Sequence, residues 1–141
     1  HVLAEGMGAL VAVKLLEKLK ESIRSVVLLN PILSLKHHLE LEKEHRFFYK
    51  KLMRELTSAH QYDQATLENE IFSMDDMVNL DFDCPITIIQ VLAGGRSYAQ
   101  SKLYQKIINT PKINTTFILP EKKPQLATMF IKFFNSHESV L

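Results

Sequence analysis

Hydrophobic and polar positions along the chain follow two periods, one typical of buried strands and one typical of helices. Short apolar runs predict strands at residues 1–4, 25–29, 85–92 and 114–119. Longer stretches with apolar positions three or four residues apart predict helices at residues 9–20, 34–59, 63–72, 98–108 and 125–134. Because a helix between two strands forms a crossover connection, this order predicts an α/β fold with a mostly parallel sheet flanked by helices.

The helix predicted at residues 9–20 is apolar around most of its circumference. Its charged residues, Lys14, Glu17 and Lys18, share one stripe at helical spacing, and aliphatic residues fill the remaining positions. A helix with so narrow a polar stripe is packed on most of its surface. We therefore expect this helix to have few exposed aliphatic side chains.

Residues 34–80 interrupt the alternation with a helical insert in which charged and large apolar residues are mixed. Ser34 is predicted to cap its first helix, and Asp63 lies in the first turn of a later one. The chain contains no repeat or linker, so we expect a single domain over residues 1–141 with the insert inside it.

The sequence opens with His1 inside an apolar segment, so we expect a fragment that lacks its N-terminal strands. Such a fragment leaves a sheet edge at residues 1–4 with unpaired backbone groups. A protein partner or the missing N-terminal half is expected to complete the sheet at this edge.

Composition and charge exclude several classes of protein. Lys and Arg number 17 and Asp and Glu number 16, so the net charge of +1 provides no positive field for nucleic acid. The sequence has no apolar run long enough to span a bilayer, and Cys84 is its only cysteine. A disulfide framework and a CxxC metal site are therefore excluded, and Cys84 is expected to be a small buried residue. A soluble protein in the cytoplasm is the expected class.

The turn after the first predicted strand carries a recognisable motif. It reads Ala4-Glu5-Gly6-Met7-Gly8, and the strand at residues 25–29 ends in Asn30-Pro31. With the insert and the strand, helix, strand and helix that follow, nearly the whole chain resembles the second half of an α/β-hydrolase. In that family this turn carries G-x-S-x-G, the nucleophile elbow, and Gly6 stands where the resemblance implies the catalytic serine.

The other two members of the catalytic triad are also missing from the positions that the resemblance implies. The turn for the acid contains Gly94 and no carboxylate, and the second location known for the acid holds Asn30. The loop for the histidine places Lys122 at its position. Three positions fail together, so we interpret the chain as a catalytically inactive α/β-hydrolase-like protein that acts as a structural or partner-binding subunit. We expect no cofactor.

The turn itself is expected to keep the geometry of the elbow. An elbow holds its central residue at a positive φ, which glycine adopts without strain. The resemblance also implies that the backbone N–H of Met7 points where one oxyanion-hole donor lies in active relatives. The motif also fits a glycine-containing turn of some other α/β fold.

Two alternative functions stay open at this point. One is a serine hydrolase of the esterase, lipase or thioesterase class whose nucleophile has been replaced by Gly6. The other is a non-catalytic module that binds a small apolar ligand beneath the insert, where Phe47, Phe48 and Leu52 are candidate lining residues.

A metal site is the weakest of the candidate chemistries. His38, Glu42 and His45 share one helical stripe, but they lack the spacing of a zinc-binding HExxH motif. We interpret the stripe as a solvated charged helix face and expect no metal.

Overall fold

The computed structural model describes residues 1–43, 46–60, 63–73, 78–92 and 113–138 of the chain. These residues divide into two compact units. The first comprises His1–Leu33 and Val78–Leu141 and contains the sheet, and the second comprises Ser34–Met77 and is helical. The helix predicted at 98–108 lies outside the described residues.

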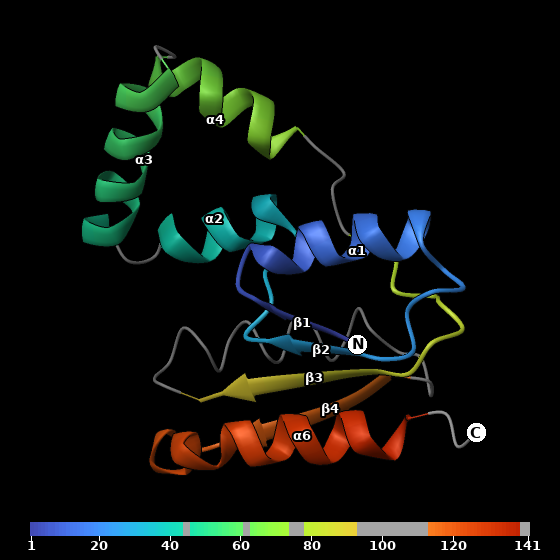
Figure 1. Ribbon diagram of the computed structural model, residues 1–141. Helices are drawn as coiled ribbons and strands as arrows, with labels where there is room; N and C mark the ends of the chain where they lie inside the picture. Colours follow the sequence, from blue (N-terminus) through green and yellow to red (C-terminus); the bar gives the residue numbers. More distant parts are fainter. Residues whose placement is uncertain (44–45, 61–62, 74–77, 93–112, 139–141) are drawn as a thin grey trace. The chain divides into compact units, whose positions relative to one another are not determined.

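A four-stranded parallel sheet forms the centre of the first unit (Figure 1). Its strands lie in the order β1-β2-β3-β4, which is also their order along the chain. Their bounds are Val2–Glu5, Val26–Leu29, Ile86–Val91 and Ile113–Ile118. Every residue of β2 and β3 is buried, as expected for the central strands of a parallel sheet. The coarse prediction of an α/β fold with a parallel sheet is confirmed.

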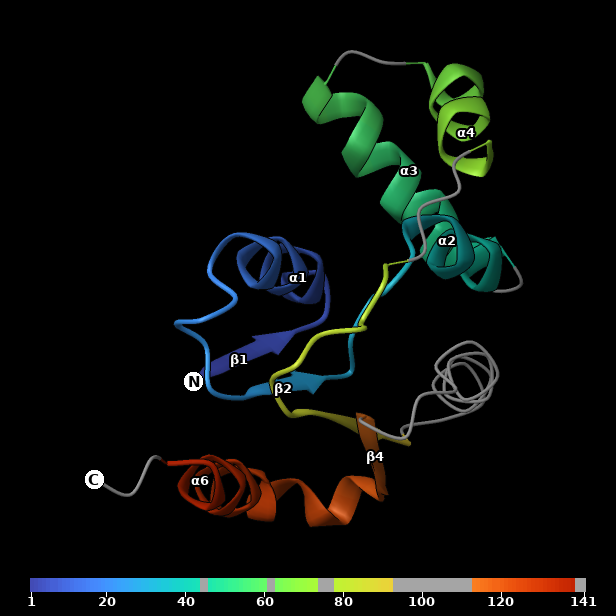
Figure 2. The ribbon, with the colours of Figure 1, turned by 90° about the vertical axis from the view of Figure 1, so that its right-hand side faces the viewer.

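Helices cover the two faces of this sheet. Helix α1 (Gly8–Lys18) lies on one face, and α6 (Leu126–Ser136) lies on the other (Figures 1 and 2). Side chains alternate between the faces, so Val27, Leu29 and Ile89 point toward α6 and pack against its apolar residues. The buried face of α1 consists of Ala9, Ala12, Val13 and Leu16.

The second unit contains three helices, and two of them lie where the sequence predicted a single helix over residues 34–59. These helices are α2 (Leu35–Lys43), α3 (Arg46–His60) and α4 (Gln64–Phe72). Leu39 of α2 packs with Met53 of α3 in one buried cluster, which Tyr49 and Ile71 complete. In a continuous helix, Leu39 and Met53 would be about 21 Å apart. Burial of both side chains against each other therefore favours two helices.

Capping residues set the starts of these helices. The side chain of Ser34 accepts a hydrogen bond of 3.2 Å from the His37 N–H, as the sequence predicted for a cap. Asp63 precedes α4 as its N-cap, and its carboxylate accepts a 2.9 Å hydrogen bond from the Thr66 N–H. The Thr66 hydroxyl also donates to this carboxylate at 2.7 Å, and these two hydrogen bonds, that from the hydroxyl first, lower the pKa of Asp63. The sequence placed Asp63 in the first turn, one residue too far into the helix.

Two further expectations need correction. Glu42 is buried and lies 3.9 Å from His38, so this part of α2 is not a solvated charged face. The segment around Lys122 was expected to form a loop, but Pro120–Gln125 form a short 3-10 helix, η1. Proline at its first position fits a helix start because that position needs no N–H donor.

Candidate functional site

The carboxyl edge of the sheet brings together the positions that the sequence singled out. Gly6 follows β1, Asn30 follows β2 and Lys122 lies in η1, which follows β4. Because the strands are parallel, these residues all lie at the same edge. Gly94, which follows β3 in the sequence, lies outside the described residues.

Gly6 forms a tight turn between β1 and α1. Its φ is +55°, the positive value expected for the central residue of an elbow. The Gly6 N–H donates to the Leu29 carbonyl at 3.1 Å, and the Gly6 carbonyl accepts from Ala9 at 3.2 Å and Ile32 at 2.9 Å. The turn is therefore held by β2, by α1 and by the segment after Asn30. A Cβ built at Gly6 would meet nothing within 4 Å, so the position has space for a side chain but carries no hydroxyl.

Met7 is the residue that immediately precedes α1. Its φ and ψ are −66° and −20°, and its carbonyl accepts a 3.1 Å hydrogen bond from the Leu10 N–H. Its side chain is 55% exposed. The proposed role of its N–H as an oxyanion donor stays a prediction.

Asn30 has the second unusual backbone conformation at this edge. Its φ is +44°, a region that asparagine tolerates better than most residues. Its backbone N–H donates to the Ile89 carbonyl at 2.9 Å, and its side-chain Oδ1 accepts from the Val91 N–H at 2.7 Å. The side chain at the alternative acid position is therefore engaged in joining β2 to β3. Sequence analysis missed this contact, although an Asn-Pro pair after a buried strand is a signal for such a turn.

Lys122 lies at the position that the resemblance implies for the histidine. It is exposed, and its N–H donates to the Leu119 carbonyl at 2.9 Å as part of η1. Two histidines occur among the described residues of the sheet-containing unit. His1 precedes β1 and His137 follows α6, so both lie at the amino edge, away from Gly6.

His1 lies between two side chains that the sequence analysis did not connect. Its Nδ1 is 2.6 Å from the Ser25 Oγ, and its Nε2 is 2.6 Å from the Glu138 Oε1. A serine, a histidine and a carboxylate in contact are the groups of a hydrolytic triad. Ser25 is fully buried, however, so its hydroxyl has no access to a substrate. We interpret this trio as a contact that ties the end of α6 to the starts of β1 and β2.

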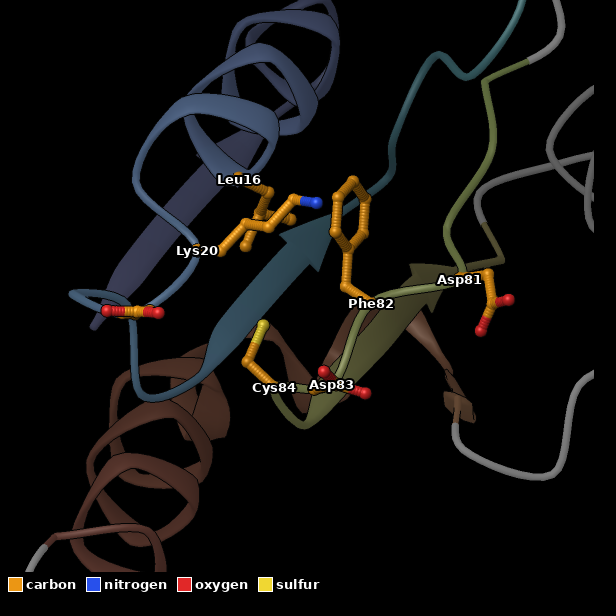
Figure 3. A pocket seen from close by; sticks show the side chains of 7 residues that line it. Leu16, Lys20, Asp81, Phe82, Asp83 and Cys84 are labelled. Atoms are coloured by element: carbon orange, nitrogen blue, oxygen red, sulfur yellow. The ribbon is translucent and has the colours of Figure 1, made fainter.

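A pocket of about 350 Å³ also lies at the amino edge (Figure 3). The residues that line this pocket include Leu16 of α1 and Lys20, which follows α1. Phe82 and Cys84, from the segment before β3, also line it. Burial raises the pKa of the Cys84 thiol, with a smaller contribution from Asp83, so the thiol is a poor nucleophile at neutral pH. Cys84 is only partly buried, in contrast to the small buried residue that the sequence predicted.

The remaining predicted site residues are not brought together by the described structure. Phe47, Phe48 and Leu52 fall in α3, but their side chains lie outside the described part of the chain. No cluster of three or more His, Cys, Asp or Glu side chains within metal-binding reach occurs among the described residues. None of the described helices is long and apolar enough to cross a membrane.

Comparisons with known proteins support the fold. No protein-family model matches the chain, and no curated protein matches it. The structure of Rv0554 from Mycobacterium tuberculosis is similar, with a TM-score of 0.55 and 14% sequence identity. The match covers 97% of this chain and 65% of the Rv0554 chain, so this chain spans about two thirds of the length of that protein. At this identity, the similarity shows an α/β fold.

Proposed function

We propose that this chain is a catalytically inactive α/β-hydrolase-like module that acts as a structural or partner-binding subunit. The observation that carries the proposal is Gly6, which takes the positive φ of an elbow and carries no hydroxyl. A serine at this position would bear backbone strain for the sake of catalysis, whereas glycine removes both the nucleophile and the strain.

Two other residues at the carboxyl edge support the same proposal. Asn30 stands at the alternative position for the acid, and its side-chain oxygen already accepts a hydrogen bond from Val91. An amide carries no charge with which to stabilise an imidazolium. Lys122 stands at the position that the resemblance implies for the histidine, so the imidazole that would act as general base is missing there. The helices of residues 34–77 correspond in sequence position to the cap-like insert of the resemblance.

The test is a direct assay of ester hydrolysis with short-chain and long-chain p-nitrophenyl esters. We expect the purified chain to hydrolyse them at the rate of buffer alone, and we expect a Gly6→Ala variant to behave in the same way. Turnover proportional to protein concentration, and lost when the protein is heat-denatured, would overturn the proposal. The Gly6→Ala variant then reports whether that turnover depends on the elbow.

A further inference from the structure

The pocket at the amino edge of the sheet has an apolar interior. Leu16, the last buried residue of α1, is 1% exposed and forms its floor. Val11 and Leu15 of the same helix are exposed, so the expectation that α1 has few exposed aliphatic side chains was wrong. The half-buried ring of Phe82 and thiol of Cys84 complete the interior. In Figure 3, the Cys84 sulfur points toward Leu16, and the Phe82 ring stands across the pocket from it.

Charged side chains surround this interior at the protein surface. Lys20, Glu21, Asp81 and Asp83 line the same pocket, and all four are exposed. One lysine and three carboxylates give the rim a formal charge of −2. Within the described part of the chain, no ion pair involves Lys20, Glu21 or Asp81. A rim of this charge attracts cations and repels anions.

The pocket favours an organic cation over a metal ion. No three His, Cys, Asp or Glu side chains lie within metal-binding reach of one another among the residues that the structure describes. The volume of about 350 Å³ lies in the range of pockets that enclose small organic ligands. An aromatic ring attracts a ligand ammonium because the face of the ring carries partial negative charge. The Phe82 ring and the acidic rim therefore attract the same kind of ligand.

We propose that this pocket binds a small organic cation, an amine with an apolar body. The body of the ligand packs against Leu16, Phe82 and Cys84, and its ammonium lies at the rim with the carboxylates. In Figure 3, the side chain of Lys20 extends toward Phe82, so Lys20 competes with a bound amine for this space. The inference is separate from the proposed loss of catalysis, because the pocket and Gly6 lie at opposite edges of the sheet.

An NMR titration of the purified chain with 2-phenylethylamine tests the proposal. Two further compounds carry the same ring and spacer: 3-phenylpropionate has a negative group and 2-phenylethanol a neutral one. The amine is expected to shift the backbone amide signals of Lys20, Phe82 and Cys84 saturably, with a Kd of about 1 mM. It should bind on the order of tenfold more tightly than the carboxylate, because only the charge differs in sign.

Four variants test the role of each part of the pocket. Lys20→Met removes the competing charge and should tighten binding of the amine on the order of threefold. Asp81→Asn removes an attracting charge and should weaken it to a similar extent. Phe82→Leu keeps an apolar wall without a ring and should weaken it about threefold. Lys18→Met is the matched control, since it removes the same charge from the end of α1 outside the pocket and should leave the Kd unchanged.

The sign of the Lys20 effect distinguishes a cation site from an anion site. Weaker binding of the amine to Lys20→Met, in a variant shown to be folded by circular dichroism, would overturn the proposal. Tighter binding of 3-phenylpropionate than of the amine would also overturn it and assign the pocket to anions. The proposal would equally fail if the amine caused no saturable shift up to about 10 mM, or shifted only signals away from the pocket.

Discussion

The side-chain oxygen of Asn30 accepts a 2.7 Å hydrogen bond from the backbone N–H of Val91, across the carboxyl edge of the sheet. The backbone N–H of Asn30 donates to Ile89 on the same strand. One residue thus joins the end of β2 to the end of β3 through two contacts. The described contacts of this side chain, at the alternative position that the resemblance implies for the catalytic acid, are structural.

Replacing Asn30 should therefore destabilise the sheet. Asn30→Ala removes the acceptor for the Val91 N–H and places alanine at a φ of +44°, so we expect a loss of about 2–3 kcal/mol in the free energy of unfolding. Asn30→Asp keeps an acceptor at the same place and should lose much less. Urea unfolding of both variants checks this. Equal losses would show that the Val91 contact contributes nothing.

Substitution of Gly6 tests whether the turn after β1 is strained for a side chain. Space is available around a Cβ at Gly6, so the expected loss comes from its φ of +55° alone. We expect Gly6→Ala to lose about 1 kcal/mol, and Gly6→Val more, because a β-branched residue tolerates this region poorly.

Gly8→Ala is the matched control for this turn. A Cβ at Gly8 would lie 3.8 Å from the Ala4 Cβ, an ordinary contact, and Gly8 begins α1. We therefore expect Gly8→Ala to leave the thermal midpoint unchanged or raise it. A midpoint unaffected by Gly6→Val would contradict the positive φ of the turn.

The sequence pattern predicts the sheet well and the helical unit less well. The runs at 25–29 and 85–92 are continuous and aliphatic, and β2 and β3 lie within them because buried parallel strands have no polar face. Residues 34–59 carry a helical period without a break signal, so the separation of α2 from α3 was missed. That separation depends on the contact between Leu39 and Met53, which are distant in sequence.

Part of the candidate site could be predicted in the same way. A glycine between a predicted strand and a predicted helix points to a turn of positive φ, and Gly6 has it. The contact from Asn30 to Val91 spans 61 residues, and the contact from His1 to Glu138 spans 137, so no local pattern could indicate either one.

The contact between Tyr49 and Glu68 should make the helical unit sensitive to pH. The Tyr49 hydroxyl donates to the Glu68 carboxylate at 2.5 Å, and Gln64 donates to it at 2.8 Å. The bond from Tyr49, and then that from Gln64, lowers the pKa of Glu68. Burial, and then the bond to Glu68, raises the pKa of Tyr49 above its ordinary value of 10.0.

Each shift favours the native state within one range of pH. The lowered pKa of Glu68 stabilises the native state at pH values above 4.5, the ordinary pKa of this group. This stabilisation is lost as the pH falls below 4.5. The raised pKa of Tyr49 stabilises the native state at pH values below 10.0, the ordinary pKa of this group. This stabilisation is lost as the pH rises above 10.0. Tyr49→Phe should therefore lower the free energy of unfolding by about 1 kcal/mol at neutral pH. Its difference from the wild type should shrink in acid and in alkali, and a difference independent of pH would contradict the coupling.

Gln90 is a buried polar residue whose replacement should not harm the fold. It is 2% exposed on β3, and its Oε1 has no hydrogen-bond partner within the described part of the chain. We expect Gln90→Leu to raise the free energy of unfolding by about 1 kcal/mol, because an unsatisfied buried acceptor is unfavourable. The control is Thr87→Val on the same strand, where the hydroxyl donates to the Asn114 carbonyl at 3.1 Å and its loss should destabilise. Chemical unfolding that ranks the two variants in the opposite order would contradict this interpretation.

The central claim is that this α/β chain lacks the histidine and the acid of a hydrolytic triad as well as the nucleophilic serine. Its most direct test restores the serine with Gly6→Ser and measures labelling by a fluorophosphonate, which reacts with activated serines. Because His1 and His137, the two described histidines of the sheet-containing unit, lie at the amino edge and away from Gly6, we predict labelling no faster than that of a Gly8→Ser control. Rapid, stoichiometric labelling of Gly6→Ser that is lost on heat denaturation would contradict the account and identify a hydrolase that lacks only its nucleophile.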